Sequence, residues 1–307
     1  MTRLLAPEAL DRATTFVDRQ ARPLERSLWA WSVGAADATA VREALAAFRH
    51  ADGGFGHGLE PDIPAPGSSV YATTLALQTL GELGTPASDP LVAGAMAFLV
   101  ERFDAAQGAW AMVPEDLDDA PHAPWWEAEE DLSGRRVNPR AEILGYGLRW
   151  PGTLPEPNLT TLLSETLDEL DRRADELEQH ELLCALRLLR APGLAEPDRA
   201  RLETVLWPVV QRLVGRDGEA WSAYGLQPVW VAESPAAPFA GALAGPIDDN
   251  LDWLIDTQAP DGAWSPAWDW SFVDAEAWAK AKRAWQGIVT VKTLRALRAY
   301  RRLPMPG

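Results

Sequence analysis

Three aspartates within four residues form a compact acidic run, Asp116-Leu117-Asp118-Asp119. A carboxylic acid can donate a proton when its neighbours hold it protonated and it faces a cavity with little water. Aromatic rings lining such a cavity would stabilise a cation formed there. The run therefore allows acid chemistry, and the alternative is a solvated acidic loop.

A second polar group consists of His57, Glu60 and Asp62. Two acids and an imidazole could serve as general acid and base, and paired carboxylates beside tryptophans would suit a carbohydrate ligand. Glu60 and Asp62 are too close in sequence to form a spaced glycosidase pair, so a partner such as Glu127 or Asp269 would be needed. The alternative is that this group caps and orders a loop.

The chain contains 15 tryptophans, which usually serve packing, sugar stacking or the lining of an apolar cavity. Four lie in segments expected to be loops and are predicted ligand contacts: Trp125, Trp126, Trp268 and Trp270. The alternative is that they cover the core. Three others belong to the repeat described below and are predicted to be structural: Trp110, Trp221 and Trp264.

Two expected helices carry further candidate ligand contacts. Asn138, Glu142 and Tyr146 follow each other at intervals of four, so they share one helix face and are predicted to project into a cavity. His180 and Cys184 are one turn apart in another helix. We predict ligand contact for His180 and a buried core thiol for Cys184, which lies among leucines.

A short segment recurs along the chain and divides it into units. Its first form is Arg49-His50-Ala51-Asp52-Gly53-Gly54-Phe55-Gly56, and variants end at Trp110, Trp221 and Trp264. The closing aromatics at 55, 110, 221 and 264 are separated by 55, 111 and 43 residues, so the long gap would hold one degenerate unit. A period near fifty residues indicates a helical repeat, and a distributed repeat favours a single domain over residues 1–307.

The repeat has a physical interpretation. Asp-Gly closes a turn after one helix, because glycine adopts backbone angles that other residues avoid. The aromatic ring then packs between neighbouring helices, while a glutamine at the preceding helix end can bond to free backbone groups.

The Q-x-x-D-G-x-W form of Gln258–Trp264, together with Asp52–Gly56, resembles the Q-W repeat of squalene/hopene cyclases and the related motif of protein prenyltransferase β subunits. The resemblance implies an all-α fold, a single α/α toroid of five to six helical hairpins. The D-x-D-D form of residues 116–119 resembles the acid motif of class II terpene cyclases, which implies that Asp118 protonates an alkene or epoxide. The zinc ligands of prenyltransferases have no counterpart here, so no metal and no cofactor are expected.

Hydrophobic periodicity, caps and prolines place the helices. The expected ranges are 7–33 with a break near Pro23, 37–50, 70–83, 90–103, 139–149, 158–173, 178–190, 197–214, 246–257 and 275–302. Connections that follow the repeat segments are long and the returns are short. Because function concentrates in long loops on a rigid scaffold, we expect the site at the end that carries them.

Charge and composition exclude several partners. The formal net charge of −17 and a pI near 4.7 disfavour nucleic acid and anionic membranes. One cysteine excludes an internal disulfide framework, and no secretory signal or membrane-spanning run is visible. These features predict a cytoplasmic protein. The resemblance to isoprenoid-handling enzymes implies an apolar small-molecule ligand, and the oligomeric state is left open.

Two function classes are compatible with the sequence. The first is an isoprenoid-handling enzyme that uses proton-initiated cyclisation, with Asp118 as the acid in an apolar aromatic cavity. The second is a carbohydrate-active or small-ligand-binding protein without cyclase activity, with Glu60, Asp62 and the loop tryptophans around a polar ligand. The character of the site distinguishes them: the first needs a buried Asp118, and the second a polar, tryptophan-edged site.

Overall fold

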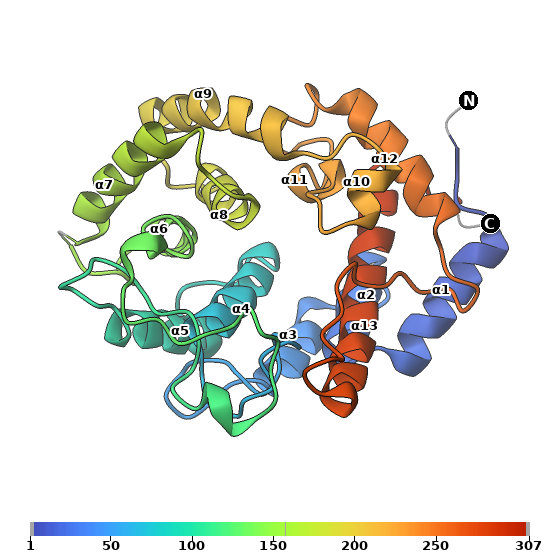
Figure 1. Ribbon diagram of the computed structural model, residues 1–307, viewed down its shortest axis with the longest axis horizontal. Helices are drawn as coiled ribbons and strands as arrows, with labels where there is room; N and C mark the ends of the chain where they lie inside the picture. The colour runs from blue at the N-terminus through green and yellow to red at the C-terminus, as the bar shows by residue number, and fades with distance from the viewer. Residues whose placement is uncertain (1–2, 157, 305–307) are drawn as a thin grey trace. The chain divides into compact units, whose positions relative to one another are not determined.

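The computed structural model describes residues 3–156 and 158–304, and these residues fold into α-helices joined by loops (Figure 1). Extended pairing within the described residues is limited to isolated bridges, so the prediction of an all-α fold is confirmed. The α-helices are α1 (Pro7–Gln20), α2 (Pro23–Ser32), α3 (Ala38–Ala46), α4 (Val70–Glu82), α5 (Pro90–Glu101), α6 (Arg140–Arg149), α7 (Asn158–Arg173), α8 (Gln179–Leu189), α9 (Glu196–Leu213), α10 (Gly218–Ser222), α11 (Pro228–Val231), α12 (Ala244–Asp256) and α13 (Ala275–Ala299), and the 3-10 turns are η1 (Leu117–Asp119) and η2 (Ser133–Arg135).

Local capping explains where several helices begin. The Ser69 side chain accepts a hydrogen bond of 3.0 Å from the Ala72 amide at the start of α4. Asp89 caps α5 in the same way, with a bond of 2.9 Å from the Leu91 amide. Pro23 opens α2, which accounts for the predicted break after α1.

The segment between the expected helices 197–214 and 246–257, for which no helix was predicted, contains the short helix α11. Pro228 occupies its first turn, where the absent N–H costs nothing. The other short helix, α10, is capped by Asp217, whose side chain accepts a hydrogen bond from the Ala220 amide. A single turn is too short to show a hydrophobic period, and so the sequence pattern missed both helices.

The chain divides into two compact units. Unit 1 combines the segment up to Leu45 with the segment from Val214 onward, and unit 2 is Ala46–Leu213. The single domain and the closed toroid stay predictions. Within the described residues, no helix is both long enough and apolar enough to cross a bilayer.

Unit 2 is built from pairs of packed helices. The helices α4, α6 and α8 contact one another in sequence, and α5, α7 and α9 each pack against one of them (Figure 1). The contact between α6 and α8 is close because Gly145 places the α6 backbone against α8: a Cβ there would lie 3.3 Å from the Cα of Leu188. This packing aligns one face of α6 with one face of α8.

In unit 1, both α1 and α2 pack against the long helix α13 (Figure 1). Phe16 of α1 and Trp278 of α13 are buried, as is Gly287, whose lack of a side chain allows Ala21 to approach. The turn at Gln258–Trp264 also contacts α1, because the Gln258 Nε2 donates a bond of 2.9 Å to the Ala9 carbonyl.

The repeat tryptophans have the structural role predicted for them. The Trp110 indole donates a hydrogen bond of 2.7 Å to the Leu99 carbonyl of α5. The Trp264 indole donates one of 2.8 Å to the Leu254 carbonyl of α12. Each ring is buried and satisfies a carbonyl in the last turns of the helix that precedes it.

Candidate functional site

A buried carboxylate on α6 is the centre of a polar cluster in unit 2. The Glu142 side chain is 3% exposed, and each of its oxygens accepts hydrogen bonds from other elements. Its Oε1 accepts bonds from the Tyr146 hydroxyl and, at 2.8 Å, from Gln78 Nε2. Its Oε2 lies 3.0 Å from Arg187 Nη1 and 3.5 Å from Cys184 Sγ. We call Gln78, Glu142, Tyr146, Cys184 and Arg187 the Glu142 cluster.

Three helices hold this cluster together. Glu142 and Tyr146 are one turn apart on α6, Cys184 and Arg187 lie on α8, and Gln78 lies on α4. An unpaired buried carboxylate would be costly, so the Arg187 guanidinium and the neutral donors together make the burial of Glu142 possible. The sequence prediction that Glu142 and Tyr146 share one face of α6 agrees with this arrangement, because both side chains reach the same cluster.

Burial changes the titration of the cluster. It raises the pKa of the Tyr146 phenol well above its ordinary value, and the nearby Glu142 carboxylate raises it further. The pKa of the Cys184 thiol is also raised, first by burial and then by Glu142. Burial is the largest influence on the pKa of Arg187 and lowers it, but Glu142 together with Cys184, Tyr146 and Tyr71 outweighs burial, and the net shift is upward. The cluster therefore keeps a neutral phenol, a neutral thiol and a charged guanidinium at neutral pH.

One edge of the cluster is open to solvent. The Arg187 side chain is 31% exposed, and its Nε and Nη2 bond to no residue that the structure describes. The Tyr71 side chain of α4 is close enough to influence the pKa of Arg187 electrostatically. The Tyr71 ring in turn contacts the Trp126 ring, with 4.7 Å between centroids. Half-buried aromatic rings thus extend the cluster toward the surface.

The Trp126 indole N–H is shielded from solvent and has no hydrogen-bond partner among the described residues. A buried donor without an acceptor costs about 1–3 kcal/mol. Trp126 also packs on the small apolar group of Ile63, Ala65 and Leu117, which joins its loop to the loop that precedes α4. The Trp126 ring is therefore fixed by packing, and its indole N–H has no acceptor among the described residues.

Two aspartates of the acidic run are exposed to solvent, whereas the proposed acid chemistry requires a carboxyl group in a water-poor cavity. Asp118 and Asp119 are exposed on η1, and the Asp118 side chain is 98% exposed. Asp118 Oδ1 lies 3.4 Å from His122 Nε2, a nitrogen that is itself shielded from solvent. The structure thereby corrects the prediction that Asp118 is a proton donor in a water-poor cavity, because water surrounds its carboxylate.

Asp116 and His57 belong to a separate group beside the first repeat turn. The His57 ring is exposed and stacks on the His50 ring, with 4.0 Å between centroids. The pKa of His50 is lowered by burial and by His57, while Asp52 and Asp116 oppose the shift. Asp116 Oδ1 is buried without a hydrogen-bond partner among the described residues, and the carboxylate lies against Gly67.

The two other acids near the first repeat are buried. Glu60 is 3% exposed and Asp62 is 2% exposed. Glu60 Oε1 accepts a bond of 3.3 Å from the Asp62 amide, and the Asp62 carbonyl accepts one of 3.1 Å from the Ala123 amide. These contacts order the loop, as in the alternative stated for this group. Their catalytic role stays a prediction.

The remaining candidates lie elsewhere. His180 is half-exposed at the start of α8, where its Nδ1 lies 2.8 Å from Glu178 Oε2. Trp125 is 49% exposed, beside Trp126. In unit 1, Trp268 is half-buried against Tyr224 and Trp285.

Trp270 lies in the core of unit 1. Its side chain is fully buried, and its ring contacts Trp278 at 5.6 Å between centroids. The structure therefore corrects the prediction of ligand contact for Trp270, since no ligand can reach a fully buried ring. Asp269 belongs to the same packing, because its Oδ2 accepts a bond of 2.8 Å from the Trp278 indole.

Residues 3–156 and 158–304 contain no group of three or more histidine, cysteine, aspartate or glutamate side chains placed to hold a metal ion. The donor set of the Glu142 cluster agrees with this finding. Its carboxylate is already occupied by an arginine, a phenol and an amide, which leaves no place for a cation.

The sequence patterns did not identify three residues that define the site, Tyr71, Gln78 and Arg187, nor His50, which stacks on His57 in the separate group. Tyr71 and Gln78 are seven residues apart on α4, a spacing that puts them on one helix face. Polar residues on the same face of an otherwise apolar helix were the available signal. Arg187 had no such signal, because its partner Glu142 lies 45 residues away in the sequence.

Comparisons with known proteins identify no family. No family model matches the chain, and no curated protein matches it. Among solved structures, a crystal structure of a protein from Actinoplanes aligns over 96% of this chain and 99% of its own, with 20% identity and a TM-score of 0.51. The type II terpene cyclase MstE from Scytonema aligns over 94% of this chain and 99% of its own, with 14% identity and a TM-score of 0.45. The first likeness concerns the fold alone, and the second is too low to support a conclusion.

Proposed function

We propose that this protein binds a small, polar, hydroxyl-bearing molecule, such as a sugar, at the open edge of the Glu142 cluster. The observation that carries the proposal is the proximity of a buried, fully hydrogen-bonded carboxylate, a partly exposed arginine and a tilted aromatic pair on neighbouring elements of unit 2. Small-molecule sites combine apolar or aromatic surface with a few fixed polar groups in this way.

The chemistry of the edge favours hydroxyl groups. The Trp126 N–H lacks an acceptor among the described residues, and the free nitrogens of Arg187 are further donors. A hydroxyl oxygen accepts hydrogen bonds from such donors, and the hydroxyl group can donate a hydrogen bond to a protein carbonyl or carboxylate. The ring faces of Tyr71 and Trp126 suit the apolar side of a sugar ring.

The cluster would act by holding Arg187 in one orientation. Glu142 fixes Nη1, and Gln78 and Tyr146 fix Glu142, so the free side of the guanidinium faces a ligand without losing rotamer freedom on binding. Proton-initiated cyclisation of an isoprenoid is not part of this proposal, because the Asp118 carboxylate is in solvent.

The test uses the indole N–H of Trp126 as the reporter. We would record the indole resonances of the 15 tryptophans while titrating glucose, galactose and N-acetylglucosamine, with farnesyl diphosphate as the isoprenoid probe. Trp126→Phe assigns the resonance. We expect a saturable downfield shift of the Trp126 signal with a sugar, and weaker binding after Arg187→Gln.

Trp125→Phe is the matched control, because Trp125 is the neighbouring residue and is 49% exposed. It should leave the sugar affinity unchanged. A saturable shift only with farnesyl diphosphate would contradict the polar-ligand proposal, as would a Trp126 resonance that no probe moves.

A further inference from the structure

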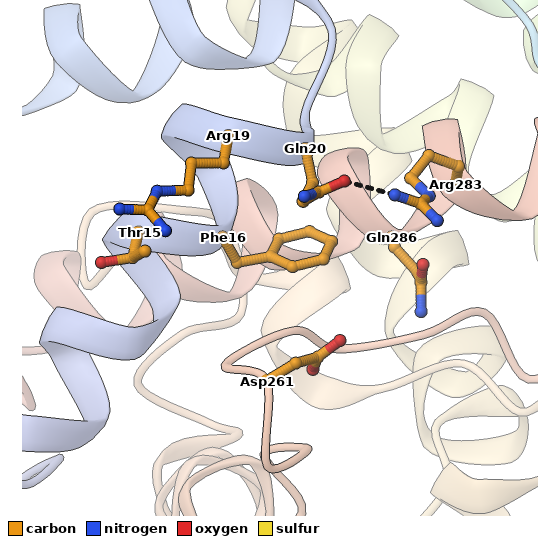
Figure 2. A pocket seen from close by; sticks show the side chains of 7 residues that line it. All are labelled: Thr15, Phe16, Arg19, Gln20, Asp261, Arg283 and Gln286. Atoms are coloured by element: carbon orange, nitrogen blue, oxygen red, sulfur yellow. Dashed lines mark hydrogen bonds between the residues drawn. The ribbon is translucent and has the colours of Figure 1, made fainter.

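A pocket in unit 1 forms a second site, separate in its residues from the Glu142 cluster (Figure 2). It has a volume of about 320 Å³, at the lower end of the range for small-molecule sites. Its walls come from α1, from α13 and from the repeat turn that precedes α13. The lining residues are Thr15, Phe16, Arg19, Gln20, Asp261, Arg283 and Gln286.

Two guanidinium groups dominate the charge of the pocket. Arg19 and Arg283 lie on opposite sides of the Phe16 ring in the view of Figure 2. Asp261 carries the one negative charge among the lining residues, so the pocket is net positive in a chain whose formal charge is −17. A local cationic site on an acidic protein attracts small anions without attracting polyanions such as nucleic acid.

Arg19 differs from the arginines of unit 1 that are held in ion pairs. It makes no hydrogen bond or ion pair with any residue that the structure describes. Arg3, by contrast, pairs with Asp256, and Arg302 pairs with Asp248 and Asp252. The guanidinium of Arg19 is thus available in full to a ligand.

Arg283 is fixed rather than free. Its Nη1 donates a hydrogen bond to the Gln20 Oε1 across the pocket, which leaves Nε and Nη2 without partners among the described residues (Figure 2). Gln286 is held by a bond of 3.1 Å from its Nε2 to Ser265 Oγ. These bonds pre-orient one arginine and one amide, which reduces the entropy lost on binding.

Asp261 and Phe16 determine which other groups a ligand of this pocket must carry. Asp261 Oδ1 accepts a bond of 3.1 Å from the Ala263 amide within the turn, and Oδ2 has no partner among the described residues. Phe16 is 6% exposed and gives the pocket an apolar floor. A ligand that fits both needs a donor for Asp261 and carbon surface for Phe16, in addition to an anionic group.

We propose that this pocket binds a small hydroxylated anion. Its carboxylate or phosphate group would bind the guanidinium of Arg283, and the exposed Arg19 side chain, which points away from Arg283 in Figure 2, would turn toward the same group. A hydroxyl group of the ligand would donate to Asp261. Guanidinium groups bind both kinds of anion through paired N–H donors, so the geometry defines the shared chemistry, and the experiment distinguishes the two sources.

The test is isothermal titration of the full chain with glucose 6-phosphate, glucuronate, inorganic phosphate and glucose. We expect at least one of the two sugar anions to bind at this pocket with an affinity that depends on Arg19. Any heat with glucose would come from the site proposed in unit 2 and should be the same after Arg19→Gln. Binding of only one anion would identify the preferred group. Arg19→Gln should weaken binding by about tenfold or more, the loss typical of a charge-assisted hydrogen bond. Asp261→Asn should weaken glucose 6-phosphate but leave inorganic phosphate unchanged.

Arg298→Gln is the matched control, because it removes the same charge from the exposed surface of α13 outside the pocket. It should leave the affinity unchanged. Absence of heat with both anions would overturn the proposal, as would an equal loss in Arg19→Gln and Arg298→Gln, which would indicate general electrostatic attraction. Trp126→Phe should not affect this site, so its outcome is independent of the proposed function in unit 2.

Discussion

Two repeat turns, one in each unit, are built alike and are used differently. The turn at Asp52–Phe55 precedes α4, and the turn at Asp261–Trp264 precedes α13. In the first, the Phe55 amide donates a bond of 3.0 Å to the hydroxyl of Thr73 on α4. In the second, the Trp264 amide donates a bond of the same length to the hydroxyl of Thr290 on α13. The backbone scaffold is therefore shared.

The aspartates of the two turns differ. Asp52 Oδ1 accepts bonds of 2.9 Å from both the Gly54 amide and the Ser68 hydroxyl, so it ties its turn to the loop before α4. Asp261 Oδ1 accepts a bond from its own turn, and the side chain lines the unit 1 pocket. Both repeats therefore supply a rigid turn. The contacts of the turn aspartate differ, so that Asp52 connects its turn to a loop and Asp261 is available to line a pocket.

Among substitutions in the two turns, removal of the closing aromatic rings should lower the free energy of unfolding most. We expect Phe55→Ala and Trp264→Ala each to lower the free energy of unfolding by about 3–5 kcal/mol, because both rings are buried. Trp264→Ala should cost more, since the bond to the Leu254 carbonyl is also lost. Urea unfolding measures the loss, and hydrogen exchange locates it. A change below about 1 kcal/mol in either variant would show that the rings do not hold the turns.

The turn glycines come next. Gly53 has φ of +89° and Gly262 has φ of +94°, and an added Cβ would overlap the Gly94 carbonyl in the first case and the Arg12 backbone in the second. We expect Gly53→Ala and Gly262→Ala to destabilise by about 2–4 kcal/mol, the sum of left-handed strain and overlap.

Gly84→Ala is the control for this pair. Gly84 also has a positive φ, +66°, but nothing lies within 4 Å of an added Cβ. Its cost should be limited to about 1–2 kcal/mol of backbone strain. Equal thermal shifts for all three variants would mean that close approach of the backbones contributes nothing.

Loss of the threonine hydroxyls should have a smaller effect. Thr73→Val and Thr290→Val each leave a buried amide, that of Phe55 or Trp264, without its acceptor, and we expect a loss of about 1–3 kcal/mol. Thr→Ser at either position keeps the hydroxyl and should restore most of the stability. If both serine variants unfold at the same urea concentration as the valine variants, the hydroxyl is not the stabilising group.

The aspartates should give the smallest effect and distinguish the turns most sharply. Asp52→Ala loses two bonds and Asp261→Ala loses one, so we expect losses of about 1–2 and 0.5–1 kcal/mol, in that order. Ser68→Ala should remove the difference between them, as a double-mutant cycle with Asp52→Ala would measure. The reverse order of stabilities would contradict the comparison.

The sequence predicted those parts of the molecule that depend on neighbours in the chain. Helix ends such as Ser69 before α4, the turn glycines and the paired face of Glu142 and Tyr146 all follow from local spacing. It did not predict the partners of Glu142. Gln78 lies 64 residues away and Arg187 lies 45 residues away, and only helix packing brings them to the same carboxylate.

The acidic run shows the converse case. Asp116, Asp118 and Asp119 matched a chemical pattern by type and spacing, but spacing does not determine exposure. The segment of residues 111–137 places Asp118 in solvent, whereas Glu142, which lies within α6, is buried and accepts hydrogen bonds from two other helices. A motif names residues that could react, and tertiary burial decides which can.

The burial of Cys184 makes its labelling rate a measure of local opening in unit 2. It is the only cysteine of the chain, and it lies at the contact of α6 and α8 with a thiol whose pKa burial raises. A thiol-specific reagent reacts with the thiolate, so it can modify the native protein only in the moments when these helices separate. The labelling rate of Cys184 therefore reports how often α6 and α8 separate. A ligand that binds only while these helices are packed would lower that rate in proportion to the fraction of the protein that it occupies.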